Sequence, residues 1–264
     1  MAVTVPDILD MKRRGERFAM LTAYDYTTAS LLAEAGIPIL LVGDSLANTM
    51  LGYPTTLPVT MAEMLHHARA VARGAPGQLL VGDLPFNSYH ASDEEAIRNA
   101  ARMLQAGMHA VKLEGGGRIA ELVGTLTARG IPVMGHLGLT PQSVHLFGGF
   151  RVQGREAAAA ERIAADARAL QESGAFAVVL EGVPRALAAS ITHRLDIPTI
   201  GIGAGPDCDG QVLTVTDMLG LTRGHVAKFV KAYAALGDEA IAAARRFAAE
   251  VASGAYPDDA HSYH

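Results

Sequence analysis

The sequence contains no tryptophan, and among its 264 residues only 7 are phenylalanine and 7 are tyrosine. Half of the residues are hydrophobic, so the core of the protein has to be built mainly from aliphatic side chains. The single cysteine, Cys208, excludes an internal disulfide. A chain without disulfides is typical of a reducing compartment, and we therefore expect a cytoplasmic protein.

Blocks of like charge and long apolar runs are also missing. The net charge is −5, which does not favour binding to nucleic acid. No apolar run is long enough for a membrane span, and the first 18 residues lack the apolar stretch of a secretory signal. These absences predict a protein with neither a nucleic-acid nor a membrane partner.

Short aliphatic runs alternate with longer segments of helical character along the whole chain. The runs are almost continuously apolar, as expected for parallel strands that are buried on both faces. Helix starts are indicated by capping boxes at Thr60–Glu63 and Ser92–Glu95, and Pro184 suits a first helical position. The predicted strands are Phe18–Ala23, Ile39–Gly43, Leu79–Gly82, Ala110–Leu113, Pro132–Gly135, Ala177–Leu180, Pro198–Ile202 and Val212–Val215.

Eight strands separated mostly by helices predict an α/β fold, a single (β/α)8 TIM-type barrel. We expect residues 1–264 to form one barrel domain with a short N-terminal helical extension and a C-terminal helical tail. One region fits poorly, because Gly205–Val212 has no room for a helical crossover. Either the seventh helix is missing or the eighth strand is misplaced, and an open doubly wound sheet is the alternative fold.

Acidic residues follow several of these strands. The stretch Leu40–Ser45 reads LLVGDS and Leu79–Leu84 reads LLVGDL, so Asp44 and Asp83 both stand where a strand ends. In parallel α/β proteins active sites lie at these ends. Two adjacent carboxylates repel each other unless a cation lies between them, and an oxygen donor set favours Mg2+ over zinc. The alternative role of each aspartate is to cap the following helix.

Further ionisable residues end the later strands. Lys112 and Glu114 are two residues apart and project to the same face of a strand. Lys112 could bind a substrate carboxylate, form a Schiff base, or make a structural ion pair. Glu181 could act as a general base or form a salt bridge, and His136 could be functional or only hydrogen-bonded.

The chain resembles the ketopantoate hydroxymethyltransferase family in a series of motifs that occur in the same order. The resemblance extends from about Thr22 to the C-terminal SGAYPDDAHSYH and covers nearly the whole chain. The motifs are LTAYDY (21–26), LVGDS (41–45), TLPVT (56–60), DLPF (83–86), VKLEGG (111–116), GHLGLTPQS (135–143), GGFRVQGR (148–155) and IPTIGIGAG (197–205).

The resemblance implies a (β/α)8 barrel that transfers a one-carbon unit from 5,10-methylenetetrahydrofolate to 3-methyl-2-oxobutanoate in pantothenate biosynthesis. It implies one Mg2+ per subunit, held by Asp44 and Asp83 with Glu114 nearby, and a homodecamer of two pentameric rings. Asp44, Ser45, Asp83, Lys112 and His136 would contact the oxo acid, and Glu181 would accept the proton.

Two other functions are compatible with a barrel of this kind. The first is a metal-dependent carbon–carbon lyase of the isocitrate lyase or phosphoenolpyruvate mutase type. Such enzymes typically carry a cysteine in the loop that corresponds to GHLGLTPQS, where this chain has none. The second is a non-catalytic barrel that binds a small acid, which would have no need for so many ionisable groups at the strand ends.

Overall fold

The computed structural model describes residues 2–224 and 226–264 and divides the chain into two compact units. The first unit, Met1–Thr214, contains all eight strands of the barrel, and the second, Val215–His264, is helical. Within the described residues, no helix has the length and apolar character that crossing a membrane requires.

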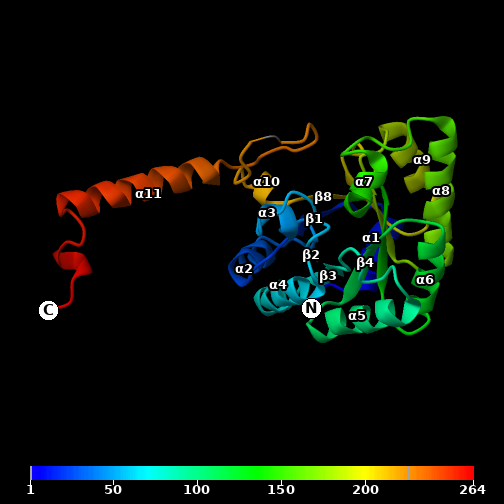
Figure 1. The fold of residues 1–264 in the computed structure, drawn as a ribbon, viewed down its shortest axis with the longest axis horizontal. Helices are drawn as coiled ribbons and strands as arrows, with labels where there is room; N and C mark the ends of the chain where they lie inside the picture. The colour runs from blue at the N-terminus through cyan, green and yellow to red at the C-terminus, as the bar shows by residue number, and fades with distance from the viewer. Residues whose placement is uncertain (1, 225) are drawn as a thin grey trace. The chain divides into compact units, whose positions relative to one another are not determined.

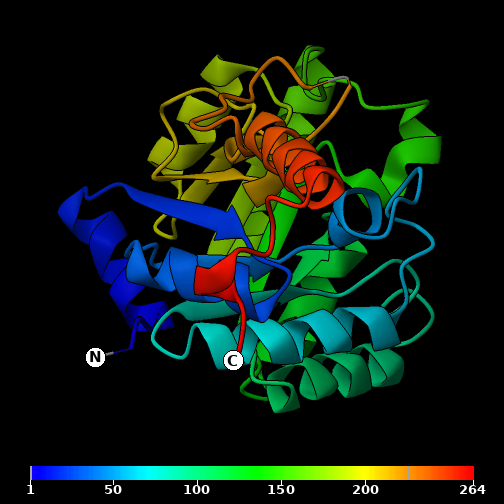
Figure 2. The same cartoon turned by 90° about the vertical axis from the view of Figure 1, so that its left-hand side faces the viewer.

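The eight strands of the first unit pair in parallel and in sequence order, and β8 pairs with β1 to close the barrel. This closure confirms the (β/α)8 prediction and excludes the open doubly wound sheet. Figures 1 and 2 show the helices outside the ring of strands. The strands are β1 (Phe18–Thr22), β2 (Ile39–Val42), β3 (Leu79–Asp83), β4 (Ala110–Glu114), β5 (Val133–Gly138), β6 (Ala177–Glu181), β7 (Thr199–Ile202) and β8 (Gly210–Leu213).

Local capping determines where several of the helices begin. Thr60 and Glu63 form the predicted capping box at the start of α4, and Ser92 accepts a hydrogen bond from the backbone N–H of Glu95 at the start of α5. Pro184 stands one residue before α9, at its N-cap. The α-helices of this unit are α1 (Val5–Arg14), α2 (Tyr26–Glu34), α3 (Leu46–Thr49), α4 (Met61–Gly74), α5 (Asp93–Gln105), α6 (Arg118–Thr127), α7 (Val144–Phe147), α8 (Ala157–Glu172) and α9 (Arg185–Arg194).

The N-terminal helix α1 closes the end of the barrel at which the strands begin. Ile8 is fully buried in the main aliphatic cluster, together with the first residues of several strands. The ammonium of Lys12 lies 2.9 Å from the carboxylate of Asp209, directly before β8, and also donates to the carbonyl of Thr192. Because this end is plugged, ligands can reach the barrel interior only from the end at which the strands finish.

No helix lies in the fully described stretch between β7 and β8, so the seventh helix of the barrel is missing. This is one of the two alternatives that the short segment Gly205–Val212 leaves open. The predicted eighth strand, Val212–Val215, is wrong in its bounds, because β8 runs from Gly210 to Leu213. Ile200 in the middle of β7 pairs with Gly210, so the chain returns only about half the height of the barrel between the two strands. A loop of residues 203–209 is long enough for that return, and no helix is needed.

The long segment after β5 contains regular secondary structure in part of its length. The predicted loop Leu137–Arg155 begins as the end of β5 and continues into a 3-10 turn, η1 (Pro141–Ser143), and helix α7. Gln142 and Val144 in this segment are buried, whereas Leu146 and Phe150 are exposed. The segment therefore contacts the barrel through its first half.

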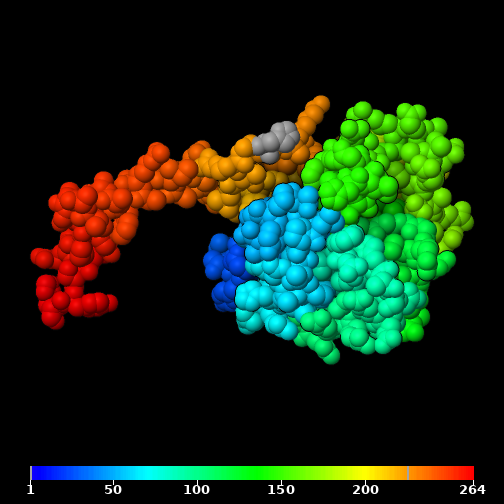
Figure 3. Space-filling view, viewed as in Figure 1, coloured from blue at the N-terminus to red at the C-terminus, as the bar shows by residue number. Residues whose placement is uncertain are grey.

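The second unit consists of α10 (Val215–Met218), α11 (Leu236–Ser253) and a 3-10 turn, η2 (Asp259–His261). Helix α11 starts near Arg223, whose guanidinium lies 2.8 Å from the carboxylate of Asp238. The large hydrophobic side chains of α11 that remain exposed are Leu236, Ile241, Phe247 and Val251. Figure 3 shows the residues of α11 in space-filling form, in the orange-to-red part of the colour scale.

The last residue of β5 provides a test of how tightly the end of the barrel is built. Gly138 has a positive φ of +93°, and an added Cβ would overlap the carbonyl oxygen of Glu181 and lie 2.6 Å from Val183 Cγ1. We expect Gly138→Ala to lower the free energy of unfolding by about 2–5 kcal/mol, from backbone strain plus overpacking. Chemical denaturation measures this change.

Gly36→Ala is the matched control. Gly36 also has a positive φ, +76°, but no atom lies within 4 Å of its added Cβ. The control should therefore cost only the backbone term, about 1–2 kcal/mol. Equal losses in the two variants would contradict the close approach between β5 and β6.

Candidate active site

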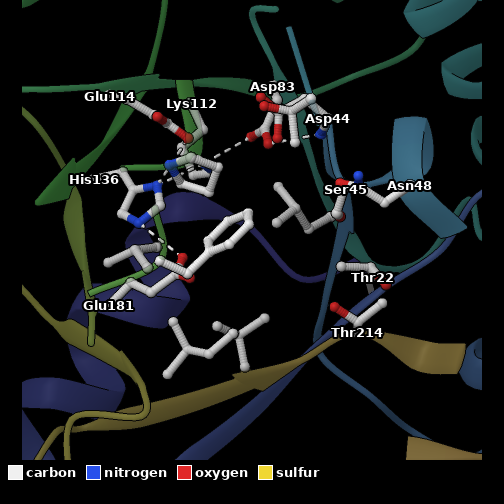
Figure 4. A pocket seen from close by; sticks show the side chains of 17 residues that line it. Thr22, Asp44, Ser45, Asn48, Asp83, Lys112, Glu114, His136, Glu181 and Thr214 are labelled. Carbon is white, nitrogen blue, oxygen red and sulfur yellow. Dashed lines mark hydrogen bonds and ion pairs between the residues drawn. The ribbon is translucent and has the colours of Figure 1, made fainter. Parts of the chain in front are cut away.

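A cavity of about 180 Å³ lies at the end of the barrel at which the strands finish, and it contains every predicted site residue (Figure 4). The acids Asp44 and Asp83 come from the ends of β2 and β3, and Glu181 comes from the end of β6. The full set of predicted residues in its lining is Asp44, Ser45, Asp83, Lys112, Glu114, His136 and Glu181. The tertiary structure thus gathers groups that are up to 137 positions apart in the sequence (181 − 44).

The register of the parallel strands places opposite charges side by side. Asp83 is the registered partner of Lys112, and the ammonium lies 3.2 Å from Asp83 Oδ1. Glu114 is the registered partner of His136, and its Oε1 lies 3.4 Å from the ring Nδ1. Because neighbouring registered residues point to the same side of the sheet, both pairs face the barrel interior.

Lys112 is buried yet keeps its charge. Burial by itself would lower the pKa of this ammonium, but the negative charges of Asp83, Glu114 and Asp44 outweigh burial and raise the pKa above its ordinary value. A lysine held in this state carries a positive charge at neutral pH. It is therefore suited to binding an anionic ligand and is a poor nucleophile.

His136 lies between two carboxylates. Its Nδ1 is 3.1 Å from the ammonium of Lys112 and 3.4 Å from Glu114 Oε1. Nε2 lies 3.2 Å from Glu181 Oε2. Burial and Lys112 oppose a second proton, but the contacts with Glu114 and Glu181 outweigh them and raise the pKa of His136 to about 9.

Asp44 and Asp83 are held together through the backbone. The amide N–H of Asp44 donates to Asp83 Oδ2 over 2.9 Å, which brings the ends of β2 and β3 into contact. Burial raises the pKa of both carboxyls; nearby Glu114 and Asp83 reinforce the effect at Asp44, whereas Lys112 opposes it at Asp83. Ionising two buried carboxyls side by side is costly, and a cation bound between them would reduce the repulsion between their charges.

The oxygen atoms of this cluster fit a hard divalent cation. Asp83 Oδ1 and Glu114 Oε1 are buried and make no well-aligned hydrogen bond within the described residues. The same part of the chain contains no group of three or more His, Cys, Asp and Glu side chains close enough to enclose an ion. The donor set therefore suits Mg2+, which is commonly bound through one or two carboxylates and keeps several waters, rather than a metal that requires a full protein cage.

Several polar residues at the site were not singled out from the sequence. Gln142 and Tyr89 are buried beside the acids, and the hydroxyl of Tyr24 lies 2.8 Å from that of Ser45. Tyr24 and Gln142 belong to the motifs LTAYDY and GHLGLTPQS, which is the only signal that could have indicated them. Of the GIGAG run, only Ile202 lines the cavity.

The metal-free protein should be more stable when Asp44 cannot ionise. A carboxyl whose pKa is raised on folding stabilises the fold at low pH, and that stabilisation is lost as the pH rises through the folded pKa. We therefore expect Asp44→Asn to raise the melting temperature at pH 7 in the presence of a chelator, by about 2–4 °C for each kcal/mol gained. Differential scanning calorimetry measures this shift.

The advantage of Asp44→Asn over the wild type should shrink as the pH is lowered. Asp10→Asn, which changes an exposed carboxylate paired with Arg13, is the control and should leave the melting temperature nearly unchanged. A lower melting temperature for Asp44→Asn at pH 7 would contradict the charge repulsion at this site.

Comparison with known proteins places these residues in a family. Residues 2–259 match the family described as ketopantoate hydroxymethyltransferase. The 3-methyl-2-oxobutanoate hydroxymethyltransferase of Syntrophus aciditrophicus is 60% identical over 262 residues, which cover 99% of this chain and 96% of the relative. The enzyme of the same name from Mycolicibacterium vanbaalenii is 58% identical over 253 residues, covering 96% of this chain and 90% of the relative.

Solved structures share the fold at much lower sequence identity. Phosphonopyruvate hydrolase in complex with oxalate and Mg2+ aligns with a TM-score of 0.64 at 15% identity, covering 99% of this chain and 92% of that structure. A 2,3-dimethylmalate lyase of the PEP mutase/isocitrate lyase superfamily aligns with a TM-score of 0.61 at 15% identity, covering 98% and 91%. These structures support the barrel, and the family match decides the class: the chain belongs to the ketopantoate hydroxymethyltransferase family and is a transferase enzyme.

Proposed function

We propose that the enzyme transfers a hydroxymethyl group from 5,10-methylenetetrahydrofolate to 3-methyl-2-oxobutanoate, giving ketopantoate for pantothenate biosynthesis. The observation that carries this proposal is the arrangement of one cavity, in which Asp44, Asp83 and the cationic Lys112 face Glu181 across the barrel (Figure 4). The reaction needs such an arrangement because a weakly acidic C–H bond next to a ketone has to lose its proton.

The two aspartates are the residues that would hold Mg2+, with Glu114 close to them. Asp44 and Asp83 are linked by the 2.9 Å hydrogen bond, and Asp83 Oδ1, which lies 3.2 Å from the Lys112 ammonium, makes no well-aligned hydrogen bond within the described residues. When bound, the cation would draw electron density from the substrate's keto oxygen and so acidify the neighbouring C–H bond. The activity then depends on whether the chain's own residues can orient the substrate and accept the proton.

Lys112, Ser45 and His136 would bind the oxo acid. The positive charge of Lys112 attracts the substrate carboxylate, and the Ser45 hydroxyl, held by Tyr24, can donate a hydrogen bond. We assign Lys112 an electrostatic role rather than a Schiff base, because its raised pKa keeps the amine protonated.

Glu181 would accept the proton from the substrate. Its side chain is 16% exposed, the most accessible of the ionisable side chains in the charge pairs of the cavity, and it lies beside His136, opposite Asp44 and Asp83 (Figure 4). The carbon that loses this proton forms the new bond to the methylene carbon of the folate, whose two bonds to the folate nitrogens break. One water supplies the hydroxyl group, and its remaining proton and the proton taken from the substrate go to the two nitrogens, so tetrahydrofolate leaves with no change in oxidation state.

The folate has to bind partly outside the cavity. A volume of about 180 Å³ is below the range of pockets that enclose drug-sized ligands, so it suits the oxo acid and the transferred carbon. Phe150 lines the cavity and is also 63% exposed, so this side chain is available to a flat ligand that enters from solvent.

Glu181→Gln tests the assignment of the base. The substitution preserves shape but removes basicity, and the loss of a general base typically lowers a rate by about 100- to 10,000-fold. The measurement is exchange of the C3 hydrogen of 3-methyl-2-oxobutanoate in deuterated water containing MgCl2, without folate. We expect rapid exchange by the wild type and near-background exchange by Glu181→Gln, with little change in oxo acid affinity.

Glu172→Gln is the control, because Glu172 is an exposed glutamate paired with Arg168 on α8. It should exchange at the wild-type rate. If Glu181→Gln also exchanges at that rate, another group is the base. If the wild type itself fails to exchange the hydrogen, the proposed function is wrong.

We also propose that the protein assembles as a homodecamer, as the family resemblance implies. The support is the exposed apolar side chains of α11: Ile241, Phe247 and Val251 are between 42% and 57% exposed, and Phe247 and Val251 are four residues apart and therefore share one face of the helix. A second copy of the chain is the occupant that a closed symmetric assembly would supply.

Analytical ultracentrifugation tests this assembly. The wild type should sediment as a particle of ten copies, and Phe247→Glu combined with Val251→Glu should yield smaller species, because charge is placed on the apolar face. Glu239→Gln on the same helix should leave the assembly intact. A wild-type monomer at micromolar concentration would contradict the proposal.

The cytoplasmic location that we expect from the sequence stays a prediction.

A further inference from the structure

Gln142 has a buried polar side chain that forms hydrogen bonds with three residues, which come from the segments after β2 and β3. It lies in the 3-10 turn after β5 and is 7% exposed. Its Nε2 donates to Asp44 Oδ2 over 2.9 Å and to the carbonyl of Leu84 over 3.0 Å. Its Oε1 accepts from the hydroxyl of Tyr89 over 2.7 Å, so both ends of the amide have partners.

The surroundings allow the amide of Gln142 only one orientation. The carbonyl of Leu84 and the carboxylate of Asp44 are acceptors, so the nitrogen has to face them. The oxygen then faces Tyr89, whose hydroxyl also lies within reach of the backbone N–H of Glu114. If the amide were reversed, its oxygen would face two further oxygens and its nitrogen would lose both acceptors.

The backbone of Gln142 extends the same bridge to the second acid. Its N–H donates to Glu114 Oε2 over 2.9 Å. One residue therefore binds one oxygen of Asp44 and one oxygen of Glu114, which come from the ends of β2 and β4. Glu114 Oε1, the other oxygen, makes no well-aligned hydrogen bond within the described chain.

We propose that Gln142, supported by Tyr89, is a positioning residue for the divalent-cation site: it binds one oxygen of Asp44 and one of Glu114 and so fixes which oxygens remain for the ion and its waters. The inference rests on the Mg2+ function proposed above. It adds that the turn after β5, rather than the acids alone, determines the affinity of the site.

Neighbouring residue types cannot replace this side chain. Glutamate would place a carboxylate against Asp44. Asparagine is one methylene shorter than glutamine, so its amide would not reach the partners of the Gln142 amide. Methionine has similar length and flexibility but neither the donor nor the acceptor. Gln142→Met therefore removes the hydrogen bonds with little change in the packed volume.

The experiment is titration of the full chain with MgCl2 by isothermal calorimetry. Loss of a hydrogen-bond partner of a metal ligand typically weakens metal affinity about 10- to 100-fold, and we expect that range for Gln142→Met. Tyr89→Phe, which removes only the hydroxyl, should weaken it in the same direction by a smaller factor. Gln153→Met is the control, because the one hydrogen bond that the Gln153 side chain donates within the described residues goes to the carbonyl of Arg151 on the same loop.

A second readout separates positioning from general damage. In the deuterium-exchange assay, Gln142→Met should need more MgCl2 for half-maximal rate, yet reach a rate within a few-fold of the wild type at saturating MgCl2. A merely structural role would lower the saturated rate and leave the MgCl2 requirement unchanged. Tyr89→Phe serves as the variant if Gln142→Met fails to fold.

The outcomes distinguish the inference from the function on which it rests. Wild-type MgCl2 affinity in both Gln142→Met and Tyr89→Phe would overturn the positioning role alone. A wild type that binds no Mg2+ would overturn the metal centre and the inference together. A third outcome is that the variants bind Mg2+ more weakly but the wild type fails to exchange the oxo acid hydrogen. That outcome would support the positioning role and overturn the proposed substrate.

Discussion

The buried ion pair between Asp83 and Lys112 is the interaction on which the rest of the site depends. The two residues are registered partners on β3 and β4, and the 3.2 Å separation of their charges follows from that register. Without Lys112, Asp83 would be buried without its ion-pair partner, and removing one partner of such a pair is strongly destabilising. The register of two strands thus decides whether the acids can be buried at all.

The acid cluster is costly to the fold, and this cost is typical of a functional site. Burial and mutual repulsion raise the pKa of Asp44, so the ionised form opposes folding at neutral pH. The barrel tolerates this because its other end is closed by α1, where Ile8 adds to a continuous aliphatic cluster. Stability is supplied at the end where the strands begin, and chemistry is placed where they finish.

The turn after β5 connects the acid cluster with the opening of the cavity. Gln142 connects it to Asp44 and Glu114, and the same segment continues to Phe150 at the opening of the cavity. The acids and the opening of the cavity are therefore linked by one stretch of backbone.

The sequence by itself determined the barrel and the acids at the strand ends. Apolar runs such as LLVGD are buried on both faces, and a strand projects Lys112 and Glu114 to one side, so local pattern was sufficient. Only the tertiary structure decided that β8 begins at Gly210, since its start depends on the height at which it meets β7 and β1. Only the tertiary structure placed Gln142 against Asp44, 98 residues away, because a hydrogen bond of that span leaves no periodic signal in the chain.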